Sequence, residues 1–475
     1  MAPKATPMSA VDTSWLRMES PTNRMMISIV LVFESAIPLA SFRRLLKERF
    51  LRFQRFRQRA TKRGERYYWE DDPWFDLDNH LHVIALPGRN DQEELERLSS
   101  DLNSTPLDFS KPLWQIHYID NYQGGCALFV RIHHCIADGI SLVRVLLQLT
   151  DESPDSKVTE MRPSAKAVSP RPPYWKRLYA ETKNTLLTAR DQLNQAWQQV
   201  QNEPGYLRKL GREGLKIGEE CLKLGLGPAD PPTPLKGDLC GRKRVAWAPA
   251  LSLDEVKATA KAMGGTVNDV LMSAATGALH TYLKQAGESL PDPGIHVAVP
   301  FNLRPLDQPI QNLGNQFGLV LVPLPVGTTC PRLRFSQVRQ EMMRLKRSYQ
   351  AQVTYSLLDL FGRGPDLLER RALELLSNKT SAVLTNVPGP RSTLYMCGAR
   401  LTQPMFWVPQ TGGVGVGMSI FSYDNTVQFG LISDKRLIDS PNDVVEEFIR
   451  SFHQLRDLAL ERINQRGELQ ERRAV

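Results

Sequence analysis

Two adjacent histidines, His133 and His134, end an apolar run, "CALFVRIHH", and begin the segment "HHCIADG". An unperturbed imidazole titrates near neutral pH, so it can take a proton as a general base. Successive side chains of a strand point to opposite faces. One histidine is therefore expected to face a cavity and the other the scaffold. The alternative at this stage is that both imidazoles fill hydrogen-bonded positions in the core.

A metal site is the third interpretation of this pair. Zinc requires ligands within tetrahedral reach, and neighbours on opposite faces of a strand cannot easily bind one ion. The other histidines form no second pair at helical spacing; they are His80, His82, His117, His280, His296 and His453. We therefore expect no metal. Cys135, beside the pair, is expected to be a small apolar filler.

The residues around this segment alternate between strand-like and helix-like patterns up to about residue 150. Strands are expected at 25–34, 114–120 and 126–134, and an amphipathic helix is expected over 39–56. A turn at Gly139, braced by an ion pair of Asp138, is expected to lead into a further helix. That helix carries one apolar stripe, which consists of Leu142, Val143, Leu146 and Leu149.

Composition changes at residue 151, where a segment rich in Pro, Ser and Lys predicts a linker. Two polar helices are expected to follow, at about 174–201 and 206–224. Strand and helix alternation resumes near residue 243. We therefore predict an N-terminal domain at 1–150, a linker and helical connection at 151–240 and a C-terminal domain at 241–475. Two domains also suit a chain of 475 residues.

The net charge of +9 and the sequence pI near 9.2 permit attraction to anionic partners. No nucleic acid is expected, because no finger, basic-zipper or RNA-binding signature accompanies the charge. No segment approaches the ~18 consecutive apolar residues of a membrane span. The six cysteines form no CxxC pair and no secretory signal begins the chain, which favours a reducing, cytoplasmic location.

Further motifs accompany the histidine pair in a fixed order. They are "DTSWLRMES" near the start, "PLW" at 112–114, "VNDVLM" from Val267, "VPFNLRP" from Val299, "LGNQFG" from Leu313 and "TNVPGP" from Thr385. The segment "HHCIADG" matches HHxxxDG, the signature of coenzyme-A-dependent acyltransferases similar to chloramphenicol acetyltransferase. With its companions, the chain resembles the bacterial wax ester synthase/diacylglycerol acyltransferase family over essentially its whole length.

The resemblance implies an α/β (α+β) fold of two chloramphenicol-acetyltransferase-like domains with the active-site channel between them. It implies acyl transfer from fatty acyl-CoA to a long-chain alcohol, to diacylglycerol or to both. His134 would be the general base and His133 would support it. No acyl-enzyme would form, and acyl-CoA would be a substrate, so no cofactor is expected.

Other positions carry weaker expectations. Asn268 is a candidate oxyanion donor, but Asn268 and Asp269 equally resemble a helix N-terminal cap. Asp138 is expected to be architectural and to pair with Arg304. The remaining candidates are expected to line the substrate channel, and they are Gly314, Asn315, Thr385 and Asn386.

Two alternatives stay open: a catalytically inactive lipid-binding or scaffold protein of the same fold, and a condensation-type acyltransferase with another acceptor. No obligate protein partner is implied. The basic stretch at 39–63 suggests peripheral contact with an inner membrane or lipid inclusion. The competing interpretation is that this helix docks on its own domain and its charges stay solvated.

Overall fold

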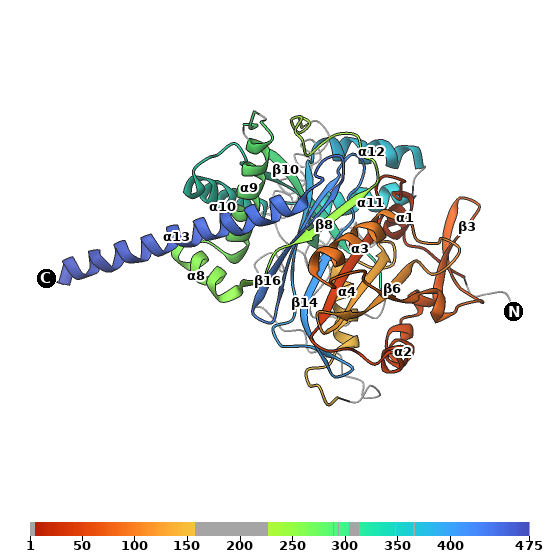
Figure 1. Cartoon of the computed structure of the whole chain (residues 1–475). Helices are drawn as coiled ribbons and strands as arrows, with labels where there is room; N and C mark the ends of the chain where they lie inside the picture. Colours follow the sequence, from red (N-terminus) through yellow and green to blue (C-terminus); the bar gives the residue numbers. More distant parts are fainter. Residues whose placement is uncertain are drawn as a thin grey trace, which may run out of the picture.

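The computed structural model describes residues 5–156, 227–287, 289–292, 294–303, 313–346, 348–363 and 366–474. Two mixed sheets stand side by side, each covered by helices (Figure 1). The helices expected at 174–201 and 206–224 lie outside the described residues, as does Arg304. The two-domain α/β architecture predicted from the sequence is confirmed.

The first sheet contains the strand that ends in the histidine pair. Its order is β13-β14-β2-β7-β6-β5, with β2 at Met26–Phe33, β7 at Gly125–His133, β6 at Trp114–Tyr122 and β5 at Leu81–Ala85. Every residue of β7 is buried, because β2 and β6 flank the strand and helices cover the sheet. The helices of this half are α2 (Leu39–Glu48), α3 (Gln92–Ser104) and α4 (Gly139–Leu149).

The helix expected over 39–56 is shorter than predicted, because α2 ends at Glu48 and two 3₁₀ turns follow at Phe50–Arg52 and Gln54–Arg57. These turns bury Phe50 and Phe56, whose rings stack with centroids 3.9 Å apart. A continuous helix would place its apolar residues along one stripe. The tighter turns instead redirect the two phenylalanines into the core.

A small sheet and a short helix complete the N-terminal half. The sheet has the order β1-β4-β3, with β1 at Ala5–Pro7, β4 at Arg66–Asp71 and β3 at Gln58–Arg63. Helix α1 (Ala10–Arg17) begins at the Ser9 cap and packs on α11 (Gln350–Arg363) of the other half. There the Ser14 Oγ donates to the Leu358 carbonyl over 3.1 Å.

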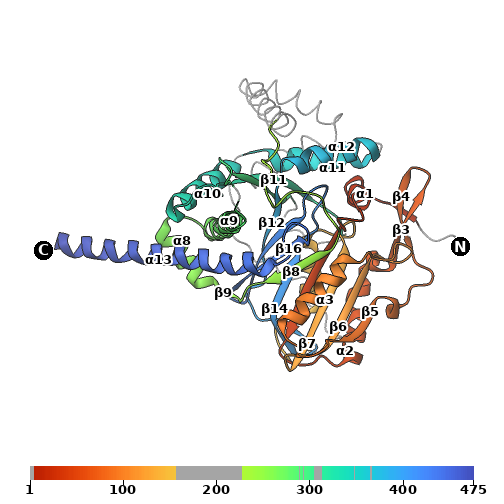
Figure 2. The same ribbon diagram turned by 45° about the horizontal axis from the view of Figure 1, so that its top comes forward.

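The second sheet has the order β11-β10-β12-β15-β16-β8, and β9 pairs with β16. Its strands are β8 (Lys243–Trp247), β9 (Leu251–Ser252), β10 (Ile295–Asn302), β11 (Phe317–Leu324), β12 (Ala382–Pro388), β15 (Val416–Tyr423) and β16 (Thr426–Asp434). Helices α8 (Leu253–Met263), α9 (Val267–Gln285) and α10 (Pro331–Leu345) cover one side, and α11 (Gln350–Arg363) and α12 (Asp366–Asn378) lie over another edge (Figure 2).

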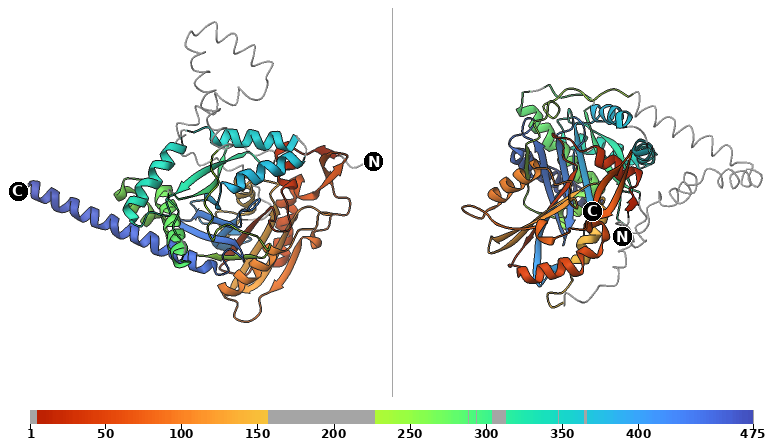
Figure 3. Two further views of the ribbon diagram at one scale, coloured as in Figure 1. Left: turned by 90° about the horizontal axis from the view of Figure 1, so that it is seen from above. Right: turned by 90° about the vertical axis from the view of Figure 1, so that its right-hand side faces the viewer.

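The long C-terminal helix α13 (Pro441–Ala474) crosses α9 and α8 and extends beyond the body of the protein (Figure 3). Close packing requires a glycine where α13 meets α9. A Cβ built at Gly277 would lie 2.5 Å from the Ser451 Oγ. None of the helices in the described ranges is long and apolar enough to cross a bilayer.

A β-hairpin from the C-terminal half joins the first sheet. This pairing was not predicted from the sequence. Strands β13 (Tyr395–Met396) and β14 (Ala399–Trp407) leave the C-terminal segment, and β14 pairs with β2 so that Trp407 faces Ser28. Where the two sheets meet, Trp407 of β14 packs near Trp247 of β8, with ring centroids 5.8 Å apart. Residues 395–407 therefore pair with the N-terminal sheet, and the predicted boundaries at 150 and 240 stay predictions.

Candidate active site

Strand β7 and the turn after it hold the two histidines and Asp138. The strand ends at His133, and the amide of His134 donates to the Met25 carbonyl over 2.7 Å. Helix α4 then begins at Gly139 with Asp138 as its N-cap. The Asp138 Oδ1 accepts from the amide and the Oγ of Ser141, at 2.8 and 2.7 Å. Capping of α4 therefore fixes the turn that follows the histidines.

The imidazole of His134 is enclosed by aromatic rings. Trp15 of α1 stacks on it with centroids 4.1 Å apart, and Phe317 of β11 lies 5.4 Å away. Burial lowers the pKa of His134 to about 4, against smaller raising effects of the Asp138 charge and the Asn315 side chain. The ring is therefore neutral near pH 7, which is the form that accepts a proton.

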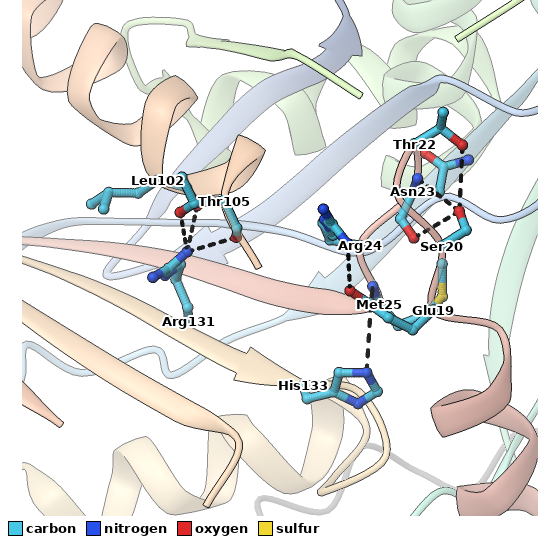
Figure 4. A network of polar contacts seen from close by, with 10 residues as sticks. All are labelled: Glu19, Ser20, Thr22, Asn23, Arg24, Met25, Leu102, Thr105, Arg131 and His133. Atoms are coloured by element: carbon cyan, nitrogen blue, oxygen red, sulfur yellow. Dashed lines mark hydrogen bonds and ion pairs between the residues drawn. The ribbon is translucent and has the colours of Figure 1, made fainter. Parts of the chain in front are cut away.

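His133 faces the scaffold, as the alternation of a strand predicts (Figure 4). Its Nε2 lies 3.6 Å from the Glu19 Oε2, and its Nδ1 accepts from the Cys135 amide over 3.2 Å. Glu19 also accepts from the Met25 amide, and the Met25 carbonyl holds His134. His133 thus supports the peptide segment to which its neighbour is bound.

Loop 313–316 brings a second set of polar groups to His134. The Asn315 Nδ2 donates to the His134 carbonyl and to the Asp12 Oδ1, at 2.8 Å in both cases. The Gln316 amide donates to the Asp138 Oδ2 over 3.0 Å. Through these hydrogen bonds, the loop connects the C-terminal half to α1, to the histidine segment and to the N-cap of α4.

The backbone conformation at Gly314 favours glycine. Its φ is +149°, a conformation that side chains rarely adopt, and a Cβ would lie 3.6 Å from the Asp12 Oδ2. The structure thus places Gly314 against a carboxylate. Gly139, in contrast, does not have a positive φ, and a Cβ there would meet nothing within 4 Å. The expectation that Gly139 permits a tight turn is therefore wrong.

The other predicted site residues form a separate group. Thr266 is the N-cap of α9, and its side chain and that of Asp269 form a capping box, so Asp269 is structural and Asn268 is not the cap. Asn268 is exposed, and its Oδ1 accepts from the Asn386 Nδ2 over 3.0 Å. Thr385 is buried between β12 and β15, where its Oγ1 lies 3.1 Å from the Ser419 Oγ.

The structure therefore brings Asp138, Gly314 and Asn315 to His134. Within the described part of the chain, the polar contacts of Asn268, Thr385 and Asn386 are with residues other than His134. Two site residues were missed, Asp12 and Trp15. Both lie in the segment "DTSWLRMES", which was identified in the sequence only as a family motif.

Burial raises the pKa of the Cys135 thiol well above its ordinary value, so this group stays protonated. A protonated thiol is a poor nucleophile, which agrees with its expected role as a filler. In the described ranges, no three His, Cys, Asp or Glu side chains are grouped as metal ligands.

A narrow apolar cavity begins beside the histidine motif. Ile132 and Gly139 both line it, and its water-accessible volume is about 80 Å³. The predicted stripe of α4 forms one wall, where Val145 joins Leu142, Val143, Leu146 and Leu149. The C-terminal half closes the other side with Val387, Met396, Pro404, Met405, Phe406 and Phe421. Phe421 belongs to β15 of the second sheet.

Known proteins are similar to this chain in sequence and in fold. The chain is 27% identical over 460 residues to a protein of Mycobacterium bovis named as a diacylglycerol O-acyltransferase, covering 91% of this chain and 87% of that protein. It is 27% identical over 439 residues to another so named from Mycobacterium tuberculosis, covering 90% of each.

Among solved structures, the wax ester synthase/diacylglycerol acyltransferase of Marinobacter aquaeolei aligns with a TM-score of 0.67 at 23% identity, covering 96% of this chain and all of that one. The first condensation domain of the calcium-dependent antibiotic synthetase aligns with a TM-score of 0.59 at 14% identity, covering 95% of this chain and 96% of the other. These likenesses establish the fold.

Two family matches cover most of the chain. Residues 8–271 match the wax ester synthase/diacylglycerol acyltransferase catalytic domain, and residues 313–456 match the C-terminal domain of the same family. The first match alone spans more than half of the sequence and contains the histidine motif. The chain therefore belongs to the wax ester synthase/diacylglycerol acyltransferase family and is an O-acyltransferase.

Proposed function

We propose that this protein transfers a fatty acyl group from acyl-CoA to the hydroxyl of a long-chain alcohol or of diacylglycerol, with His134 as the general base. The observation that carries the proposal is the neutral, buried imidazole of His134 in a segment whose neighbouring residues, Ile132 and Gly139, line an apolar cavity. Acyl-CoA is a substrate, and the reaction uses no cofactor and no metal.

The chemistry follows from the neutral ring. His134 takes the hydroxyl proton of the acceptor while the oxygen attacks the thioester carbonyl. The tetrahedral intermediate then breaks its carbon–sulfur bond. The imidazolium of His134 gives the same proton to the departing thiolate, so the ester and free coenzyme A are released and the base is restored. No acyl-enzyme is needed, and the protonated Cys135 does not supply one.

The cavity accounts for the acyl substrate. Its walls are apolar side chains from both halves, which suit a hydrocarbon chain because each buried methylene contributes ~0.8 kcal/mol. Helix α4 links the two parts of the site. Its first turn is capped by Asp138 beside His134, and its stripe continues along the cavity.

The first prediction concerns the base. His134→Ala is expected to lower turnover by roughly 10²–10⁴-fold, because that is the usual contribution of a positioned general base. His133→Ala, the matched control, should lose less, since His133 supports the backbone only. Release of coenzyme A thiol, with circular dichroism to check folding, measures both. A folded His134→Ala protein with near wild-type turnover would refute the mechanism.

A second prediction is the pH dependence of kcat/KM, which reports ionisations of the free enzyme. Because burial lowers the pKa of His134 to about 4, the neutral form persists below the ordinary range of histidine. Activity should therefore hold as pH falls through 6.5 and decline only toward 4. An acid limb centred near 6.5 would show that the ring is solvated during turnover.

The third prediction tests the cavity. Leu146→Trp should shorten the cavity two turns into α4 and lower kcat/KM for long-chain acyl-CoA more than for short-chain acyl-CoA. A series of acyl-CoA chain lengths with one alcohol acceptor measures the shift. Gln148→Trp is the matched control, because Gln148 lies on the same helix but does not line the cavity. Equal losses at every chain length would place the acyl chain elsewhere.

The acceptors and products are poorly soluble in water, so we also propose peripheral contact with an anionic lipid surface. The apolar face of α2 is already buried in its own half through Phe42, Leu45 and Leu46, as the competing interpretation held. Contact would therefore involve the charges of α2, with Arg44 and Lys47 exposed, and the indole of Trp74, which is 84% exposed.

The fourth prediction follows from those charges. Flotation with vesicles should show binding that rises with the fraction of anionic lipid and weakens with salt. Lys47→Glu should weaken binding, whereas Lys261→Glu, an exposed control on α8, should not. Long-chain alcohols or diacylglycerol should outperform amine acceptors in the thiol-release assay. Absence of vesicle binding at every salt concentration would refute the proposed contact with an anionic lipid surface. Preference for an amine acceptor would favour the condensation-type alternative.

A further inference from the structure

A buried carboxylate lies near His134, and the reaction proposed above does not use it. Asp12 of α1 is 4% exposed, and its Oδ1 accepts from the Nδ2 and the backbone amide of Asn315, at 2.8 and 3.2 Å. Burial raises the pKa of Asp12 to about 6, while hydrogen bonds from Asn315 and Ser9 and the charge of Arg55 act in the opposite direction. Burying a carboxylate lowers the stability of the fold unless the carboxylate is hydrogen-bonded. The burial of Asp12 therefore needs a physical reason.

The partner of this carboxylate has only one consistent orientation. The two hydrogens of the Asn315 Nδ2 are donated to two acceptors, the Asp12 Oδ1 and the His134 carbonyl. Reversing the amide would place its oxygen against both of these oxygens. Asp12 therefore fixes which end of the amide faces which neighbour, and the Asn315 Oδ1 is left as an acceptor.

Two buried atoms at this point have no hydrogen-bond partner in the described part of the chain. One is the acceptor Asn315 Oδ1, and the other is the ring atom His134 Nδ1. The Asn315 side chain also raises the pKa of His134, which places its polar group within reach of the ring. Buried polar atoms are rarely left unpaired. An Nδ1–H directed at this oxygen would satisfy both atoms.

We propose that Asp12, acting through Asn315, sets the tautomer of His134. The amide oxygen of Asn315 accepts from Nδ1–H, so that Nε2 remains unprotonated and serves as the base. Asp12 touches neither the ring nor the reacting atoms, so it is a positioning residue. The proposal rests on the assignment of His134 as the base.

The tautomer matters because only an unprotonated nitrogen can take the proton of the acceptor hydroxyl. A partner that holds the other nitrogen in its protonated form keeps the base ready and stabilises the imidazolium formed during the reaction. Trp15 stacks on the ring and encloses it but offers no acceptor in its plane. Two acceptors act on the ring and raise the pKa of His134: the His134 carbonyl, to which the Asn315 Nδ2 donates, and the Asn315 side chain itself. Asn315 therefore takes part in both, and its amide oxygen is the one whose position Asp12 fixes.

Asp12→Asn tests the proposal with almost no change of volume. The new amide no longer requires a donor from Asn315, so the Asn315 amide can reverse. We expect kcat to fall about 10- to 100-fold, as is typical when the partner that orients a functional imidazole is lost, with little change in the KM for acyl-CoA. Nitrogen NMR of the full-length protein labelled in its histidine rings should show the Nδ1–H tautomer in the wild type. A mixture of tautomers is expected in the variant, with His134 assigned from His134→Ala.

Ser14→Ala is the matched control. Ser14 lies on the same helix and makes a buried hydrogen bond to Leu358, away from His134. Its loss should lower thermal stability and leave kcat and the tautomer unchanged. If Asp12→Asn fails to fold, Asn315→Ala provides the same NMR comparison, because it removes the acceptor itself.

The decisive measurement is the coupling between Asp12 and Asn315 in their effects on kcat. Because Asp12 acts only through Asn315, the double variant should lose no more kcat than Asn315→Ala alone. Additive losses would overturn the proposal, as would an unchanged tautomer in a folded Asp12→Asn protein. Failure of the base assignment is a separate result: His134→Ala would then keep its activity, whereas the tautomer is measured without turnover.

Discussion

The hydrogen bonds of loop 313–316 hold the residues around His134, the proposed base, in place. Asn315 bonds to the carbonyl of His134 and to Asp12, and the Gln316 amide bonds to Asp138. The histidine segment belongs to the first sheet, whereas the loop leads into β11 at the edge of the second. The relative placement of the two sheets is therefore tied to the position of His134, the proposed base. A shift of the loop would disturb the base, the cap of α4 and α1 together.

The same enclosure that orients the imidazole also adjusts its acidity. Trp15 and Phe317 exclude water from the ring, and the resulting loss of solvation disfavours the imidazolium. A low pKa keeps the base unprotonated, but it also weakens the attraction of the ring for a proton. The charge of Asp138 and the amide of Asn315 act against burial. The site therefore balances exclusion of water against partners that favour the charged form.

Much of this could be predicted from the sequence, but not the long-range contacts. The paired histidines on a strand end, with opposite roles, follow from side-chain alternation, and the α4 stripe from helical spacing. Asp12 and Trp15 could not be placed, because they lie on a separate helix and nothing local indicates which strand end they meet. The amide of Asn315 was expected near substrate, but its hydrogen bonds are to protein groups. The pairing of β14 with β2 was equally hidden, because an apolar strand does not reveal its sheet.

The hairpin that crosses between the halves explains why the cavity and the base form one unit. Residues of β14, including Pro404, Met405 and Phe406, close the cavity opposite α4. Without that strand, the first sheet would end at β2 and the cavity would lose these residues from its wall. The N-terminal half carries His134, but the cavity proposed for the acyl chain has walls from both halves. The proposed acyl-binding cavity and the proposed base therefore both depend on contacts between the two halves, which share the strand as well as the loop.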